Sequence, residues 1–321
     1  MLSIIIASHD RKKEIISNLQ IMKKNNVFKG IDSKVILIFD GNTVSDLERE
    51  LIKSANPCNQ NLEIINFSEH KGQNYVRNIG INKSKEFCTK LILFLDDDAY
   101  IKSNEELLKA IGIINFNSKI GALGLNVIKT SNMQPQYYNN CIKRDDIFSV
   151  LFPCLAGTLI KSSIVYNYKK FFFPEEIYYG ADEWALATRV RQLGFQVYAT
   201  EICKVFHNII GGGRSKDIRF KYQYAHSYIW TITLSKRQLF ILTFIRIISL
   251  IKTSLSKEER KYFKQKISGL FCGIKDGYKN KNLDFNKYEL YVKNREIFSE
   301  LLSDSFSMRS GYINKIISKI I

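Results

Sequence analysis

The stretch that decides the fold is Leu91-Ile-Leu-Phe-Leu-Asp96-Asp97-Asp98-Ala-Tyr100, where five apolar residues run directly into three carboxylates. An apolar run of this length is typical of a strand buried on both faces of a sheet. The aspartates would then follow its carboxyl end, where open α/β sheets bind their ligands. Adjacent carboxylates repel one another, and a divalent cation would stabilise them, with oxygen ligands favouring Mg²⁺ or Mn²⁺. A solvated acidic turn explains the triplet about equally well, so the triplet alone leaves both interpretations open.

The composition indicates a globular protein with a basic C-terminal part. The 321 residues, 45% of them hydrophobic, suffice for two domains or for one large α/β domain with an appendage. The net charge is +17, and the 86 residues from Lys236 onward hold 18 Lys and Arg against 8 Asp and Glu. The preceding 235 residues therefore carry only +7 of the total, which is nearly ordinary.

The cysteines and the apolar segments favour a cytoplasmic protein. The six cysteines form no CxxC pair and no zinc spacing, and we expect them to be reduced and mostly in the core. The opening Met1-Leu-Ser-Ile-Ile-Ile6 lacks the basic leader and cleavage site of a signal peptide and predicts a first strand. The apolar stretch 238–251 is interrupted by Arg246 and is shorter than the roughly 20 residues that span a bilayer.

Strand and helix patterns alternate through the first part of the chain. Predicted strands and helices follow one another at 3–7, 11–24, 34–39, 47–54, 62–67, 72–83 and 91–95. Such repeats imply a parallel sheet with right-handed crossovers. The loops Ser8-His9, Asp40-Gly41 and Asp96–Asp98 would then lie along one edge and line a nucleotide-sized groove.

The middle of the chain supplies further carboxylates and a histidine. Strands are predicted at 120–128, 155–160, 196–200 and 203–206, and the last ends at His207. A helix predicted from Asp182 to Leu193 stops before Gly194. Alone, Asp182 is more simply explained as a helix cap. His207 precedes the basic loop Gly211-Gly-Gly-Arg214-Ser215, which strengthens its case as a ligand over that of an isolated histidine.

The residues after Arg219 predict aromatic, basic helices. Ser256-Lys-Glu-Glu259 predicts a capping box that opens a helix through about Ile274. Apolar helical faces with interleaved Lys and Arg suit an element at a membrane surface, and ordinary packing onto the body is the alternative.

Taken in order, these motifs resemble the family-2 glycosyltransferases of bacterial surface-polysaccharide type, from Met1 to about Arg219. The matching segments are Ile4-Ile-Ile-Ala-Ser-His-Asp-Arg11, Val35-Ile-Leu-Ile-Phe-Asp40-Gly-Asn42, His70-Lys-Gly72, Val76-Arg77-Asn78-Ile-Gly80, Leu95-Asp96-Asp97-Asp98 and Gly180-Ala181-Asp182-Glu183-Trp184 with Arg189 and Gly194. Phe39 and Ala181 stand where the family usually has Asp and Glu.

The resemblance implies an inverting enzyme of the GT-A fold, an α/β architecture with a Rossmann-like, mostly parallel central sheet flanked by helices and a C-terminal helical extension. It implies a glycosyltransferase domain at 1–219, divided into a nucleotide-sugar-binding half (1–119) and an acceptor and catalytic half (120–219). Residues 220–321 would form a basic amphipathic helical region.

The resemblance also implies roles for individual residues. Asp98, His207 and Asp96 would hold Mn²⁺ or Mg²⁺, with Asp182 as the catalytic base and Glu183 as its alternative. The implied donor-binding residues are Ala7, Ser8, His9, Asp40, Lys71, Arg77, Asp96 and Asp97. Arg214 is a further candidate for stabilising charge on the leaving group.

The expected partners are a nucleotide-diphosphate sugar and a glycan or lipid-linked acceptor, at the inner face of the cell membrane in peripheral contact with anionic lipid, and no nucleic acid. Other classes remain as alternatives. A sugar nucleotidyltransferase would show a Gly-rich basic loop after the first strand, where this chain has Ser8-His9-Asp10-Arg11. An aspartate-nucleophile phosphatase fits the late position of Asp96 poorly. A nucleic-acid-binding protein would use the positive charge, but the carboxylate cluster opposes contact with phosphates.

Overall fold

The computed structural model describes residues 1–41, 43–58, 61–135, 146–150, 152–167, 172–208, 217–234 and 236–279. The chain divides into two compact units. The first comprises Met1–Tyr178 and Asp182–Gly213, and the second comprises Tyr179–Ala181 and Arg214–Ile321.

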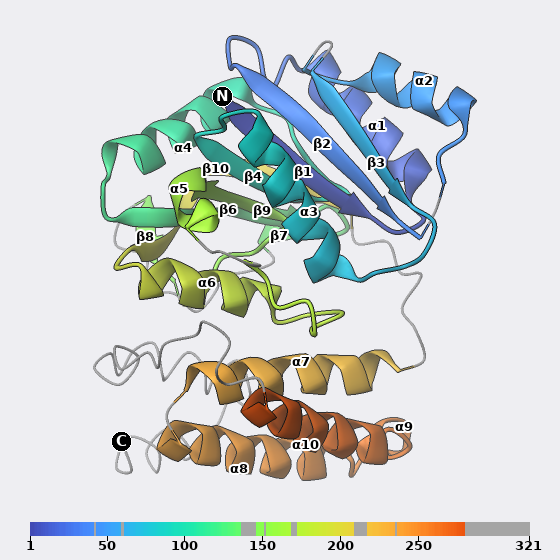
Figure 1. The fold of residues 1–321 in the computed structure, drawn as a ribbon, viewed down its shortest axis with the longest axis vertical. Helices are drawn as coiled ribbons and strands as arrows, with labels where there is room; N and C mark the ends of the chain where they lie inside the picture. The colour runs from blue at the N-terminus through green and yellow to red at the C-terminus, as the bar shows by residue number, and fades with distance from the viewer. Residues whose placement is uncertain are drawn as a thin grey trace. The chain divides into compact units, whose positions relative to one another are not determined.

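A mixed sheet forms the centre of the first unit (Figure 1). Its strands are β1 (Leu2–Ser8), β2 (Ser33–Asp40), β3 (Leu62–Phe67), β4 (Leu91–Asp96), β5 (Ala99–Ile101), β6 (Ile120–Lys129), β7 (Gln134–Pro135), β8 (Ile147–Ser149), β9 (Gly157–Lys161) and β10 (Gln196–His207). Along the sheet the order is β3-β2-β1-β4-β9-β6-β10-β5, with β7 paired to β6 and β8 to β10. Strands β3, β2, β1 and β4 are parallel, as the strand–helix alternation predicts, and β9 runs antiparallel to both β4 and β6.

Helices cover both faces of this sheet. They are α1 (Lys12–Lys24), α2 (Asp46–Ala55), α3 (Gln73–Glu86), α4 (Asn104–Phe116), α5 (Ser162–Tyr166) and α6 (Asp182–Gln192). Successive residues of a strand point to opposite faces. Ile4 accordingly belongs to the core that includes α1, α2 and α4, whereas Ile5 lies against Gly80 of α3.

The strand register places the predicted site loops at one edge. Ser8 pairs with Phe39, so that Asp40 follows directly beside it, and Ala7 pairs with Asp96. The carboxyl ends of β1, β2 and β4 therefore meet, as the sequence predicts for a parallel arrangement.

Two features of the sheet differ from the sequence prediction. Runs 196–200 and 203–206 form one continuous strand, β10, whose register against β6 shifts between Ala199 and Lys204. The sequence also predicts no strand directly after the aspartates, yet Ala99–Ile101 forms β5 and pairs with the end of β10. Both errors arise because strand pairing, rather than local pattern, decides these segments.

The second unit contains α7 (Ile218–Thr233), α8 (Lys236–Thr253), α9 (Lys257–Arg260) and α10 (Phe263–Lys279). Glycines at 269, 273 and 277 let α10 approach α7 closely. A Cβ at Gly273 would lie 2.3 Å from the carbonyl oxygen of Tyr224, a distance that no side chain permits. The single helix predicted from Ser256 to about Ile274 is in fact two, although Ser256 does cap α9 by accepting the N–H of Glu259 at 3.2 Å.

Most described cysteines are buried or half-buried, as expected, but Cys88 is exposed after the end of α3, and Cys141 lies outside the described residues. Within the described parts of the chain, we find no helix that combines the length and the apolar character needed to cross a membrane.

Candidate active site

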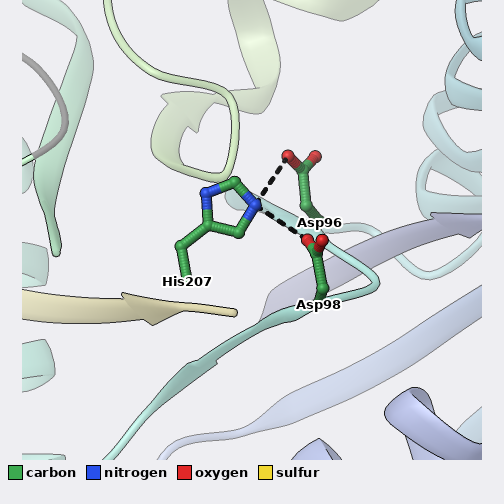
Figure 2. Close-up of side chains that lie close together, drawn as sticks. All are labelled: Asp96, Asp98 and His207. Carbon is green, nitrogen blue, oxygen red and sulfur yellow. Dashed lines mark hydrogen bonds and ion pairs between the residues drawn. The ribbon is translucent and has the colours of Figure 1, made fainter. Parts of the chain in front are cut away.

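Asp96, Asp98 and His207 form a cluster of the kind that holds a metal ion (Figure 2). One ligand atom from each residue lies within 4.8 Å of the others. The His207 Nε2 atom is 2.8 Å from Asp98 Oδ1 and 4.0 Å from Asp96 Oδ2. Two carboxylates and an imidazole this close together suit Mn²⁺ or Mg²⁺ in their ligand chemistry.

Strand pairing brings these three residues together from distant parts of the chain. Asp96 ends β4, and Asp98 precedes β5. The antiparallel register of β5 and β10 sets Ala99 opposite His207 and Tyr100 opposite Phe206, and the rings of Tyr100 and Phe206 stack at 5.6 Å between centroids. The aromatic pair supports the register that holds His207 beside Asp98.

Asp97 points away from this cluster and anchors the turn. Its carboxylate accepts hydrogen bonds from Ser8 Oγ at 2.8 Å and from Arg11 Nη1 at 3.0 Å, and its carbonyl accepts one from Asn18 Nδ2 at 3.0 Å. Arg11 Nη1 also lies 2.6 Å from Asp98 Oδ2. Arg11 and Asn18, which sequence reasoning missed, therefore position the acidic turn. The available signal was their position in the sequence, because Arg11 directly precedes α1 and Asn18 lies within that helix, which follows β1.

The electrostatics separate the neighbouring carboxylates. Burial raises the pKa of Asp97 to about 6, against the opposing influence of Arg11. Burial alone would also raise the pKa of Asp98, but the hydrogen bond and charge of His207, together with Arg11, hold that pKa below its usual value. Burial would lower the pKa of His207, yet its contacts with Asp98 and Asp96 raise it. The two opposite shifts share one cause, because the hydrogen bond between His207 and Asp98 stabilises the charged form of each partner.

Arg77 connects the cluster to the candidate base. This buried side chain of α3 forms an ion pair with Asp182, and its Nη2 lies 3.2 Å from Asp96 Oδ1. Asp182 is the first residue of α6, and the backbone reaches it through Gly180 and Ala181, both with positive φ. A left-handed alanine is a strained feature of the kind that clusters at functional sites. Burial raises the pKa of the adjacent Glu183, and Arg77 opposes that change.

The segment around Arg77 is built for close packing. Asn78 Nδ2 donates to the Phe173 carbonyl at 2.8 Å, and its Oδ1 accepts the Phe173 N–H at 2.9 Å. A Cβ at Gly80 would meet Ile5 at 2.6 Å, so that only glycine lets α3 lie this close to β1. These two neighbours explain how Arg77 is held in its buried place.

Asp40 is engaged with the segment before α3. Its carboxylate accepts the backbone N–H groups of Lys71 at 2.6 Å and Gly72 at 3.0 Å and also contacts His70 Nδ1. The His70 ring stacks on His9 at 3.9 Å, and His9 Nδ1 lies 2.6 Å from the Asp40 carbonyl oxygen. Asp40 thus orients two stacked histidines at the sheet edge, a contact set that the sequence did not predict.

The other predicted donor residues lie at or beside this edge. Ala7 is opposite Asp96 in the β1–β4 ladder. Lys71 is exposed and pairs through Nζ with Glu69 at 2.6 Å, so only its backbone contacts the edge residues named above. Arg214 lies outside the described residues.

A model of the family described as "Glycosyl transferase family 2" matches residues 3–167, just over half of the chain. The chain belongs to this family. The match covers the acidic turn, Arg77 and the histidine pair, and residue 167 precedes α6 and β10. A comparison with curated proteins found no match.

Solved structures share the fold at low sequence identity, and we take three of them. Staphylococcus aureus TarS 1-349 in complex with UDP is 14% identical, with a TM-score of 0.53 over 90% of this chain and 94% of that chain. GalNAc-T7 with UDP, GalNAc and Mn²⁺ is 11% identical, with a TM-score of 0.55 over 89% and 58%. The mannosyltransferase PcManGT from Pyrobaculum calidifontis, in complex with GDP-Man and Mn²⁺, is 12% identical, with a TM-score of 0.51 over 95% and 79%.

These neighbours identify the architecture of this family member as the GT-A fold. The present chain spans 58% of GalNAc-T7 and 55% of a longer TarS structure, so it matches little more than half of either. Two neighbours contain Mn²⁺ with a nucleotide or nucleotide sugar, and this chain has in Asp96, Asp98 and His207 a cluster able to hold such a metal.

Proposed function

We propose that this protein is a metal-dependent inverting glycosyltransferase that moves a sugar from a nucleotide-diphosphate donor to a hydroxyl of a glycan or lipid-linked acceptor. The observation that carries the proposal is the bridge made by Arg77, which contacts Asp96 of the metal cluster and Asp182 of α6. A diphosphate site and a separate carboxylate within one charged network are what a single displacement at an anomeric carbon requires.

In this proposal Asp98, His207 and Asp96 hold Mn²⁺ or Mg²⁺. When bound, the metal supplies positive charge that stabilises the diphosphate leaving group. Arg77 adds a fixed positive charge beside it, in a buried place where such charge acts strongly. The turn made by Asp97, Ser8 and Arg11 keeps the ligands in position.

Asp182 is the proposed base. It removes the proton of the acceptor hydroxyl as that oxygen attacks from the face opposite the departing diphosphate. Glu183, the alternative, is raised in pKa by burial, and it would accept a proton at a higher pH than an ordinary glutamate. One displacement without a covalent intermediate inverts the anomeric centre.

The donor nucleoside is proposed to bind at the sheet edge formed by Ala7, Ser8, His9, Asp40 and Lys71. The stacked rings of His9 and His70 offer a flat aromatic surface there. TarS, one of the structural neighbours, is recorded in complex with UDP-GlcNAc, which supports a nucleotide sugar as the donor class.

We place the enzyme in the cytoplasm, in peripheral contact with the inner face of the cell membrane, and its reaction in polysaccharide biosynthesis. The basic second unit supports this location. Residues 217–279 contain 13 Lys and Arg but only 4 Asp and Glu, and such an excess of positive charge attracts anionic lipid.

A screen of nucleotide sugars tests the proposal. With Mn²⁺ present, we expect one donor to raise the melting temperature and to be hydrolysed slowly to its nucleoside diphosphate. Asp98→Ala should abolish both effects. Slow hydrolysis that persists unchanged in Asp98→Ala would refute the metal-dependent mechanism, and a failure of every nucleotide sugar to bind would refute the donor class.

A further inference from the structure

Helix α8 is apolar on two opposite sides. One side is buried, and α8 contacts both α7 and α10. Its buried residues include Leu239, Leu242, Ile245 and Leu250. The other side is exposed, and we name its apolar residues the α8 stripe: Phe240, Phe244, Ile248, Ile251 and Leu255, the last just beyond the helix end.

The spacing of the stripe makes it one continuous surface. Its four helical members recur every four, four and three residues, which keeps them on one side of a helix. Their exposed fractions range from 40% at Ile248 to 72% at Phe240. A helix side facing water is normally polar, and a row of exposed large apolar side chains indicates a surface that binds something apolar.

Basic residues border the stripe at both ends. Lys236 and Arg237 begin α8, and Lys252 lies in its last turn, all with exposed side chains. Lys257, Arg260 and Lys261 follow Leu255 and are exposed as well. The partner must therefore present an apolar layer with negative charge above it, which is the chemistry of an anionic bilayer surface. A second copy of this chain fits less well, because it would bring the same positive charges face to face.

We propose that the α8 stripe inserts into the headgroup–acyl boundary of an anionic membrane, with the axis of α8 parallel to the membrane plane. The flanking Lys and Arg contact lipid phosphates. This inference rests on the peripheral location proposed above and names the surface that makes the contact. It does not depend on the chemistry of sugar transfer.

Vesicle flotation with the full chain tests the proposal. The test variant is Phe240→Ser with Phe244→Ser, and both substitutions are on exposed side chains. The control is Leu47→Ser with Phe116→Ser, two residues of the first unit that are 73% and 94% exposed. We expect the unmodified chain and the control to float with phosphatidylglycerol–phosphatidylcholine vesicles and not with phosphatidylcholine alone. The test variant should lose at least about tenfold in vesicle affinity.

Each outcome either supports the assignment of the α8 stripe to membrane binding or overturns it. Equal flotation of the test variant and the control would overturn the proposal, as would equal binding to neutral vesicles. Self-association of the unmodified chain that the test variant abolishes, without vesicle binding, would assign the stripe to a second copy instead. Asp98→Ala should float normally while losing donor hydrolysis, so that failure of the lipid proposal and failure of the transfer proposal are distinguishable.

Discussion

Arg77 forms a buried ion pair with Asp182, a residue 105 positions further along the chain. The same guanidinium contacts Asp96 of the metal cluster. The pair therefore links the two ends of the proposed reaction centre, one that holds the leaving group and one that receives the acceptor proton.

Removing Arg77 is expected to destabilise the fold. Arg77→Gln leaves the buried carboxylate of Asp182 without its cation, which typically costs about 3–5 kcal/mol, and also removes a partner of the half-buried Asp96. Asp182→Asn in the same chain should recover part of that loss, because one of the two carboxylates is then neutral. Denaturant unfolding of the four members of this cycle measures the coupling. Simple additivity of the two single changes would show that the ion pair contributes nothing.

The two carboxylates at the start of α6 should differ in their effect on activity. Asp182→Asn is expected to reduce acceptor glycosylation about 10²–10⁴-fold, because the proposed proton acceptor is lost, while donor binding persists, because Asp96, Asp98 and His207 are unchanged. Glu183→Gln serves as the matched control and should retain most activity. Initial rates with saturating donor measure both, and a larger loss for Glu183→Gln would transfer the role of base to Glu183.

Substitutions at the neighbouring residues Asp97 and Asp98 should differ in their effect on Mn²⁺ affinity. Asp98→Asn removes a ligand that faces His207, and we expect Mn²⁺ affinity to fall at least about tenfold. Asp97→Asn should bind Mn²⁺ nearly as well as the unmodified chain, because Asp97 faces Ser8 and Arg11. Electron paramagnetic resonance of free Mn²⁺ measures both affinities. Equal losses would mean that the turn, rather than the individual ligand, determines binding.

Metal affinity should increase with pH. The pKa of His207 is raised by Asp98 and Asp96, and the protonated imidazole cannot bind a metal. Below this pKa the metal must displace a proton, whereas above it the imidazole is already neutral, so affinity falls as the pH is lowered through the pKa. Calorimetric titration in buffers of different ionisation enthalpy should detect a release of protons on metal binding that grows as the pH is lowered. Affinity independent of pH would exclude His207 as a ligand.

The glycines of α10 that pack against α7 (Gly269, Gly273 and Gly277) should not tolerate even one added methyl group. At Gly273 a Cβ would lie 2.1 Å from Ser227 Oγ and 2.3 Å from the Tyr224 carbonyl, and Gly273→Ala should destabilise the second unit by about 1–3 kcal/mol. Gly112→Ala in α4 is the control, since its nearest neighbours are ring atoms of Phe116 at 3.9 Å. It should stabilise α4 by about 0.5–1 kcal/mol. Thermal unfolding distinguishes the two, and a neutral Gly273→Ala would show that α7 can move away.

Much of the first unit is predictable from local pattern. The apolar runs at 3–7, 34–39 and 91–95 are long enough to identify buried parallel strands, and the polar residues after them then share one edge. Asp96 and Asp98 could be assigned to a metal because they follow such a run, and His207 because it ends another.

What could not be predicted depends on contacts between distant residues. No residue close to Asp40 in the sequence indicates that its carboxylate accepts the N–H groups of Lys71 and Gly72. That contact is visible only in the structure, where the end of β2 meets the segment before α3. Arginine side chains are usually exposed, and that of Arg77 can be buried because two acidic side chains pair with it. The spacing of Gly269, Gly273 and Gly277 was a visible signal for close helix packing that sequence reasoning left unused.

The pairing of Ala99 with His207 has a consequence for how the protein matures. Asp98 and His207 are 109 positions apart, and the ligand set exists only after β10 has joined β6 and β5. A nascent chain that has released β4 but not β10 has two aspartates and no imidazole to complete the set. Binding of Mn²⁺ by all three residues would therefore require β10 to have docked, so a metal bound there would report that this part of the sheet has assembled.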